Sequence, residues 1–132
     1  MNNPQTVALN IGNYGCLAMC YLYCIGFNNV SDSTMIKMVA DALSQGILSD
    51  DCSVKSGAWL CEYFTGKKYF VDKQKITDIS NIKNPTPVFY GINGKDGHCV
   101  VVADGKIVFN PLRYSNNVIN GQPVLARFIS QC

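Results

Sequence analysis

Two side chains in this sequence have the chemistry of a nucleophile and its base. His98 is the one histidine, and it follows Gly94-Lys95-Asp96-Gly97 at the start of a valine-rich strand. Cys16 follows Gly15 in the first turn of an apolar helix, where free N–H groups and the helix dipole favour a thiolate. A thiolate attacks carbonyl groups, and a neighbouring imidazole can take up the thiol proton. The alternative is a packing cysteine and a histidine that caps a loop–strand junction.

The other cysteines predict packing. Cys20 and Cys24 lie one and two turns further along the same helix, where cysteine commonly acts as a small apolar residue. The seven cysteines include no Cys-x-x-Cys pair, so neither a zinc ribbon nor a thioredoxin motif is predicted. We expect no metal and no organic cofactor. An odd cysteine count without a visible secretory signal favours reduced thiols and a cytoplasmic protein.

Asn110 is placed beside the histidine by a predicted hairpin. A three-residue loop, Ala103-Asp104-Gly105, pairs Val102 with Lys106 and sets His98 directly across from Asn110. The amide then fixes the tautomer of the imidazole that faces the thiol. A two-residue Asp-Gly turn would instead put Asn110 on the opposite face. The simpler interpretation of Asn110 is a strand-ending residue before a proline.

A further asparagine precedes the cysteine. Asn10 stands six residues before Cys16, from where its amide and the backbone N–H of Cys16 can donate to a developing oxyanion. Asn13 is closer to the helix and is more simply a cap or turn residue. We therefore predict Asn10 for the oxyanion role.

Helices come first along the chain and strands follow. The predicted helices run from Cys16 to near Gly26, from about Ser33 to Ser44 and from about Ser53 to Phe64, each bounded by glycines or capping residues. The predicted strands cover Tyr69–Val71, Pro87–Ile92, His98–Ala103, Lys106–Asn110 and Val124–Ile129. This order predicts an α+β fold in which N-terminal helices pack on a C-terminal antiparallel sheet.

Composition excludes several classes of protein. The 132 residues are 48% hydrophobic and 15% charged, which predicts a single globular domain over residues 1–132. A net charge of +2 leaves no excess charge for a typical nucleic-acid binder. The apolar run Cys16–Phe27 is too short and too interrupted to span a bilayer. A modest basic cluster, which we expect to be a solvated face, comprises Lys67, Lys68, Lys73 and Lys75.

Four segments, taken in order, resemble a papain-like cysteine peptidase, closest to the bacteriocin-processing (double-glycine) branch. They are Gly15-Cys16 opening an apolar helix, Pro87-Val88-Phe89, Gly97-His98-Cys99-Val100-Val101-Val102, and Ile107-Val108-Phe109-Asn110-Pro111. The resemblance extends from about Asn10 to Leu112. It implies a papain-like fold and a bacterial or phage thiol protease.

The resemblance also implies a role for each candidate residue. Cys16 would be the nucleophile of a catalytic triad, His98 its base and Asn110 the residue that orients the base. Asn10 would help to form the oxyanion hole. This sequence departs from the usual pattern twice, because the family more often has Asp before the proline and Gln six residues before the cysteine.

The implied substrate is a peptide or protein, with small residues such as glycine before the cut. Within enzymes, the alternative is a cell-wall amidase of the CHAP type, which the missing export signal disfavours. In another class, the chain would be a catalytically silent module that binds a peptide or partner, for which a Cys16–His98 distance beyond hydrogen-bond reach would argue. The last alternative is an α+β domain whose spacing is coincidental.

Overall fold

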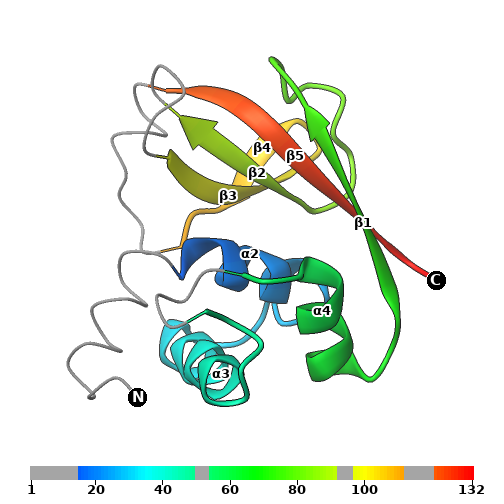
Figure 1. The fold of residues 1–132 in the computed structure, drawn as a ribbon. Coiled ribbons are helices and arrows are strands. Elements are labelled where there is room, and N and C mark those ends of the chain that lie inside the picture. Colours follow the sequence, from blue (N-terminus) through cyan, green and yellow to red (C-terminus); the bar gives the residue numbers. More distant parts are fainter. Residues whose placement is uncertain (1–14, 50–53, 92–96, 112–120) are drawn as a thin grey trace.

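The computed structural model describes residues 15–49, 54–91, 97–111 and 121–132. These residues form two layers, a helical layer and a sheet (Figure 1). The helices are α2 (Cys16–Cys24), α3 (Asp32–Ser44) and α4 (Gly57–Thr65). The strands are β1 (Tyr69–Lys75), β2 (Thr86–Gly91), β3 (Gly97–Ala103), β4 (Lys106–Phe109) and β5 (Gln122–Gln131). The predicted α+β class, with N-terminal helices packed on an antiparallel sheet, is confirmed.

Helix α2 is the central helix of the fold. Its residues from Ala18 to Leu22 are all buried, as expected for a helix that is apolar on every side. It ends at Cys24, earlier than predicted, because the chain turns at Gly26 with a φ of 113°. The N–H of Phe27 then donates to the carbonyl of Leu22 over 3.0 Å, which is the closing bond of a Schellman cap.

Serine caps define the starts of the other two helices. The hydroxyl of Ser31 accepts the N–H of Thr34 at the start of α3, and that of Ser56 accepts the N–H of Trp59 at the start of α4. The prediction that the latter helix begins near Ser53 is wrong. It begins at Gly57, because Val54 forms an isolated bridge with Leu48 before the cap is reached.

The five strands form one sheet in the order β1-β5-β2-β3-β4, and every neighbouring pair is antiparallel. All five predicted strands are confirmed with shifted ends. Strands β1 and β5 are longer than predicted, because they pair with each other from Tyr69↔Gln131 to Lys75↔Leu125. That partnership joins residues that are 50 or more positions apart, so it leaves no local signal in either strand.

The two faces of β3 serve different cores. Val100 and Val102 contribute to the core on the sheet face away from α2, whereas Cys99 and Val101 pack with Cys20 of α2. This alternation is the ordinary two-residue period of a strand. Because of this alternation, the side chain of Cys99, the residue after the histidine, faces α2.

The hairpin between β3 and β4 differs from the prediction. Ala103 pairs with Lys106, so the turn has two residues, Asp104 and Gly105, with φ values of 52° and 73°. Positive φ at both positions is typical of a type I′ turn, which suits Asp-Gly. A tight turn alone would put Asn110 on the wrong face. It does not do so, because the register shifts beyond Val102.

The shift is a β-bulge. Val102 pairs with Ile107 but Val101 pairs with Phe109, so Val108 is an extra residue on β4. One extra residue reverses the inward–outward alternation that follows it. Asn110 therefore returns to the His98 side of the hairpin, diagonally rather than directly across. Among the described residues, no helix is long and apolar enough to cross a membrane.

Candidate active site

The sequence-predicted pair His98 and Asn110 are in direct contact. Nε2 of His98 lies 2.7 Å from Oδ1 of Asn110. An amide oxygen carries no hydrogen, so Nε2–H must donate and the neutral ring must keep its proton there. Nδ1 is thereby left unprotonated and available to the thiol of Cys16, which is the tautomer that a base requires.

Cys16 and His98 form a hydrogen-bonded pair whose pKa values shift in opposite directions, that of the thiol downward and that of the imidazole upward. Hydrogen bonds from the thiol of Cys99 and from His98 outweigh burial and lower the pKa of Cys16 from 9.0 to about 4. Burial lowers the pKa of His98, but its bonds to Cys16, Asn110 and the Pro111 carbonyl outweigh burial and raise it above 6.5. A lowered thiol and a raised imidazole predict a thiolate–imidazolium pair near neutral pH.

Cys99 is a member of the site that the sequence reasoning missed. Its side chain is only 3% exposed and packs with Cys16 and Cys20. Its thiol and its backbone N–H both bond to the sulfur of Cys16, and the thiol bond is the largest single cause of the low pKa there. The same contact and its burial raise the pKa of Cys99 itself, which keeps it a protonated donor. The one available signal in the sequence was the position of this cysteine directly after the histidine.

The other two cysteines of α2 are in the packing positions predicted for them. Cys20 is fully buried, and burial raises its pKa well above that of a free thiol. Burial also raises the pKa of Cys24. Neither side chain has the imidazole or the donors that surround Cys16, so neither is a nucleophile at neutral pH.

The strand start that carries His98 has a steric requirement. The ring of Phe89 on β2 lies where a side chain at position 97 would have to be, so only glycine fits there. This packing holds β3 against β2 at the register that pairs Tyr90 with His98. At the far end of the hairpin, Phe109 stacks on Tyr23 of α2 with ring centroids 4.8 Å apart. Both contacts fix the backbone on either side of the His98–Asn110 bond.

The start of α2 supplies polar hydrogen atoms to the site. Gly15 is the N-cap residue and offers no side-chain cap, so the first N–H groups have no acceptor within the helix. A negative charge that develops next to Cys16 is stabilised there by these groups and by the helix dipole. Asn10 and Asn13, the two candidates for the oxyanion role, lie outside the described residues.

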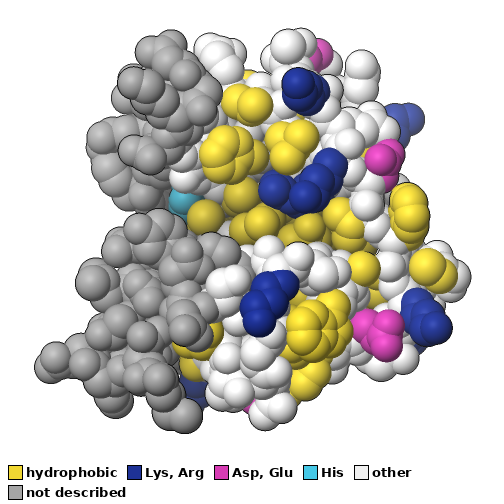
Figure 2. Space-filling model, in the orientation of Figure 1, with side chains coloured by type: hydrophobic (Ala, Val, Ile, Leu, Met, Phe, Trp, Pro, Cys, Tyr) yellow, Lys and Arg dark blue, Asp and Glu magenta, His cyan; other side chains and the backbone are white. Residues whose placement is uncertain are grey.

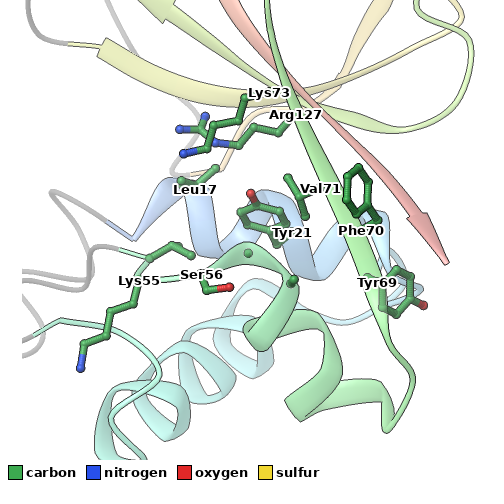
Figure 3. A pocket seen from close by; sticks show the side chains of 12 residues that line it. Leu17, Tyr21, Lys55, Ser56, Tyr69, Phe70, Val71, Lys73 and Arg127 are labelled. Atoms are coloured by element: carbon green, nitrogen blue, oxygen red, sulfur yellow. The ribbon is translucent and has the colours of Figure 1, made fainter. Parts of the chain in front are cut away.

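A pocket of about 390 Å³ lies between the helical layer and the sheet (Figure 3). It begins at Leu17, directly after Cys16, and extends past Tyr21 to the start of α4 and to strands β1 and β5. Its cationic lining side chains are those of Lys55, Lys73 and Arg127. All four lysines of the predicted basic cluster are exposed, as expected for a solvated face, and Lys73 also borders the pocket.

Comparison with family models, curated proteins and solved structures gives no match to this chain. Within the described ranges, no group of three or more His, Cys, Asp or Glu side chains has the arrangement of a metal site.

Proposed function

We propose that this protein is a papain-like cysteine hydrolase that cleaves a peptide bond through Cys16. The observation that carries the proposal is the hydrogen-bonded series from Cys16 to His98 to Oδ1 of Asn110. A thiol, an imidazole and an orienting acceptor in this order form the arrangement that activates a nucleophile. The low pKa of Cys16 and the raised pKa of His98 also support the proposal, because shifted pKa values of this kind are concentrated at functional sites.

In the proposed reaction, the proton of Cys16 moves to Nδ1 of His98 and the sulfur attacks the carbonyl carbon of the substrate. The oxygen becomes an oxyanion, which the first N–H groups of α2 stabilise. The imidazolium then gives its proton to the leaving amine as the C–N bond breaks and a thioester forms. Water, deprotonated by His98, attacks the thioester and releases the acid and the thiolate.

A catalytically silent binding module is the competing function. A Cys16–His98 separation beyond hydrogen-bond reach would have favoured it, and the hydrogen bond between them instead supports an enzyme. A CHAP-type amidase would use the same two residues, so the site geometry favours neither amide substrate over the other. The substrate panel in the test therefore includes both peptides and peptidoglycan fragments.

The test is digestion of a proteome-derived peptide library, with mass-spectrometric detection of new termini. We expect wild-type protein to generate new termini and Cys16→Ala to generate none. Peptidoglycan fragments treated in parallel report amidase activity by the release of free amines. If wild type and Cys16→Ala give the same background on every substrate, the protein is not a hydrolase of these classes.

A further inference from the structure

The pocket next to α2 is lined by cationic side chains. Lys73 and Arg127 both point into its upper part, and among the described residues that line it there is no Asp or Glu (Figure 3). Lys55 points away from them, and its Nζ donates to the carbonyl of Gly46 over 3.0 Å. The cationic character of the pocket therefore comes from Lys73 and Arg127.

These two side chains are held together at an electrostatic cost. Lys73 of β1 and Arg127 of β5 are direct partners in the strand register. Like charges directly opposite each other destabilise a sheet. Among the described residues, Nη1 of Arg127 is also buried without a hydrogen-bond partner. A buried guanidinium nitrogen without an acceptor is unfavourable unless something else supplies one.

A bound carboxylate would satisfy both features. A guanidinium binds carboxylate oxygens in a forked, charge-assisted geometry, and a neighbouring ammonium adds a second donor. Tyr21 lines the same space, as do Gly57 and Ala58 in the first turn of α4. The N–H groups of a first turn have no acceptor within their own helix. The volume, about 390 Å³, is within the usual range for a small-ligand site.

The position of the pocket connects it with the proposed nucleophile. Leu17, which lines it, is the next residue after Cys16. In the space-filling view, a band of hydrophobic side chains runs from the chain's histidine along the boundary between the two layers (Figure 2). Lys and Arg side chains lie over this band on the sheet side (Figure 2). A peptide lying along the band would reach both the thiol and the cations.

We propose that the pocket formed by Arg127, Lys73 and the start of α4 is a subsite for a carboxylate of the substrate. The carboxylate is either an acidic side chain or a free C-terminus of the peptide. This inference rests on the proposed peptide hydrolase function, and it adds a preference for acidic substrates.

The first test measures binding without catalysis. ¹⁵N-labelled Cys16→Ala is titrated with acetyl-Glu-amide, acetyl-Gln with a free C-terminus, neutral acetyl-Gln-amide and inorganic phosphate. We expect saturable shifts of the Gly57 and Ala58 amides with at least one carboxylate, and the stronger carboxylate identifies the source. Arg127→Gln should weaken that binding at least about tenfold, whereas Lys75→Gln, which removes the same charge from β1 outside the pocket, should not.

Equal shifts with the neutral amide, no saturable shift with either carboxylate, or no effect of Arg127→Gln would overturn the carboxylate site. Binding of phosphate as tight as that of the carboxylates would show a general anion site and would equally overturn it. Because Cys16 is absent from this variant, none of these outcomes depends on the proposed function.

The second test links the pocket to the nucleophile. Peptidyl acyloxymethyl ketones carry Glu or Gln at one position at a time, and iodoacetamide serves as a reagent that needs no subsite. We expect one Glu probe to label Cys16 about tenfold faster than its Gln partner. Arg127→Gln should remove that ratio without slowing iodoacetamide.

The two proposals fail in different ways. A Glu-to-Gln ratio of one with selective iodoacetamide labelling of Cys16 overturns the subsite and leaves the hydrolase proposal standing. Ordinary iodoacetamide reactivity of Cys16 counts against the hydrolase. Carboxylate binding in the first test would then describe a ligand site unrelated to a substrate, and the inference as stated would be wrong.

Discussion

Cys16 and Cys24 lie on one helix two turns apart, yet their environments give them opposite chemistry. At the start of α2, Cys16 meets the thiol of Cys99 and the imidazole of His98, which lower its pKa. Near the end of the helix, Cys24 is enclosed by apolar neighbours, and its pKa is raised by burial. The same helix thus holds one thiol with a lowered pKa and one with a raised pKa.

This contrast shows that the pKa of a cysteine on α2 depends on which groups of the sheet lie next to it. The groups that act on Cys16 come from the start of β3 and, through Asn110, from the end of β4. Cys20 shares the helix and is closer to Cys16 than Cys24 is, but it faces only the packed core of Cys99 and Val101. A thiol that lies beyond the reach of His98 remains a packing residue.

Replacement of His98 should have the largest effect, because it removes the imidazole that distinguishes the environment of Cys16 from that of Cys24. We expect His98→Ala to reduce hydrolysis of the best library peptide by about 10² to 10⁴-fold, because the base and the acid are both lost. His98→Gln, which retains polar bulk without titrating, is the matched control and should be equally inactive. Activity of either variant within threefold of wild type, with an unchanged unfolding temperature, would contradict the assigned base.

The difference should also be visible directly in pH-dependent alkylation. The thiolate of Cys16 is present above a pKa of about 4, so its labelling by iodoacetamide should be level from pH 5 upward. Cys24 stays protonated, and at pH 6 its labelling should be on the order of 10³-fold slower. Hydrolysis needs protonated His98, so it should decline as the pH rises through that residue's raised pKa, above 6.5.

Peptide-resolved mass spectrometry across pH 5 to 9 measures both sulfurs in one sample. A Cys16 rate that climbs through pH 8 to 9, as for an ordinary thiol, would remove the contrast. Unfolded protein, in which both cysteines should behave alike, is the control.

Replacement of Asn110 tests only the orientation of the His98 ring. Asn110→Ala should reduce hydrolysis by about 10- to 100-fold, because the ring loses the acceptor that fixes its tautomer. Asn110→Asp keeps an acceptor oxygen and adds a negative charge, which should raise the pKa of His98 and move the alkaline decline of activity to higher pH. If the aspartate variant is as inactive as the alanine variant, the hydrogen bond is not what orients the base.

Cys99 should have the smallest effect. Cys99→Ala removes the thiol donor and should raise the pKa of Cys16 by about one unit, since a hydrogen bond to a charged group contributes that order of free energy. Cys99→Ser restores a donor and should return the pKa. Cys61→Ala, at a buried cysteine of α4, is the control. Titration of thiolate absorbance measures the pKa, and an unchanged value in Cys99→Ala would exclude Cys99 from the site.

The fold was predictable where local chemistry decides it. Capping serines and helix-ending glycines mark α3 and the end of α4, and the uninterrupted apolar sequence of α2 marks a buried helix. The lengths of β1 and β5 were not predictable, because they depend on a pairing between distant segments. The pairing of two positive charges, Lys73 and Arg127, was not predictable for the same reason.

The structure brings together three of the predicted site residues, Cys16, His98 and Asn110. Asn10 lies outside the described residues, and part of the geometry was not predictable. Asp104-Gly105 fits either a two-residue turn or the end of a three-residue loop, so the sequence alone could not choose between them. The bulge at Val108 depends on how β4 pairs with β3. The role of Cys99 was missed because it depends on which face of β3 meets α2, and that is decided by tertiary packing.

The bulge in the β3–β4 hairpin has a consequence for comparing this chain with any future relative. What Asn110 needs is an odd number of unpaired turn and bulge residues between it and His98, here Asp104, Gly105 and Val108, and not one particular loop. A relative with a one-residue-longer turn and no bulge would present the same amide to the same imidazole. In an alignment, such a relative would have one extra residue at the turn and would lack the residue at position 108. Either change by itself would move the amide to the other face, but the two together preserve the site.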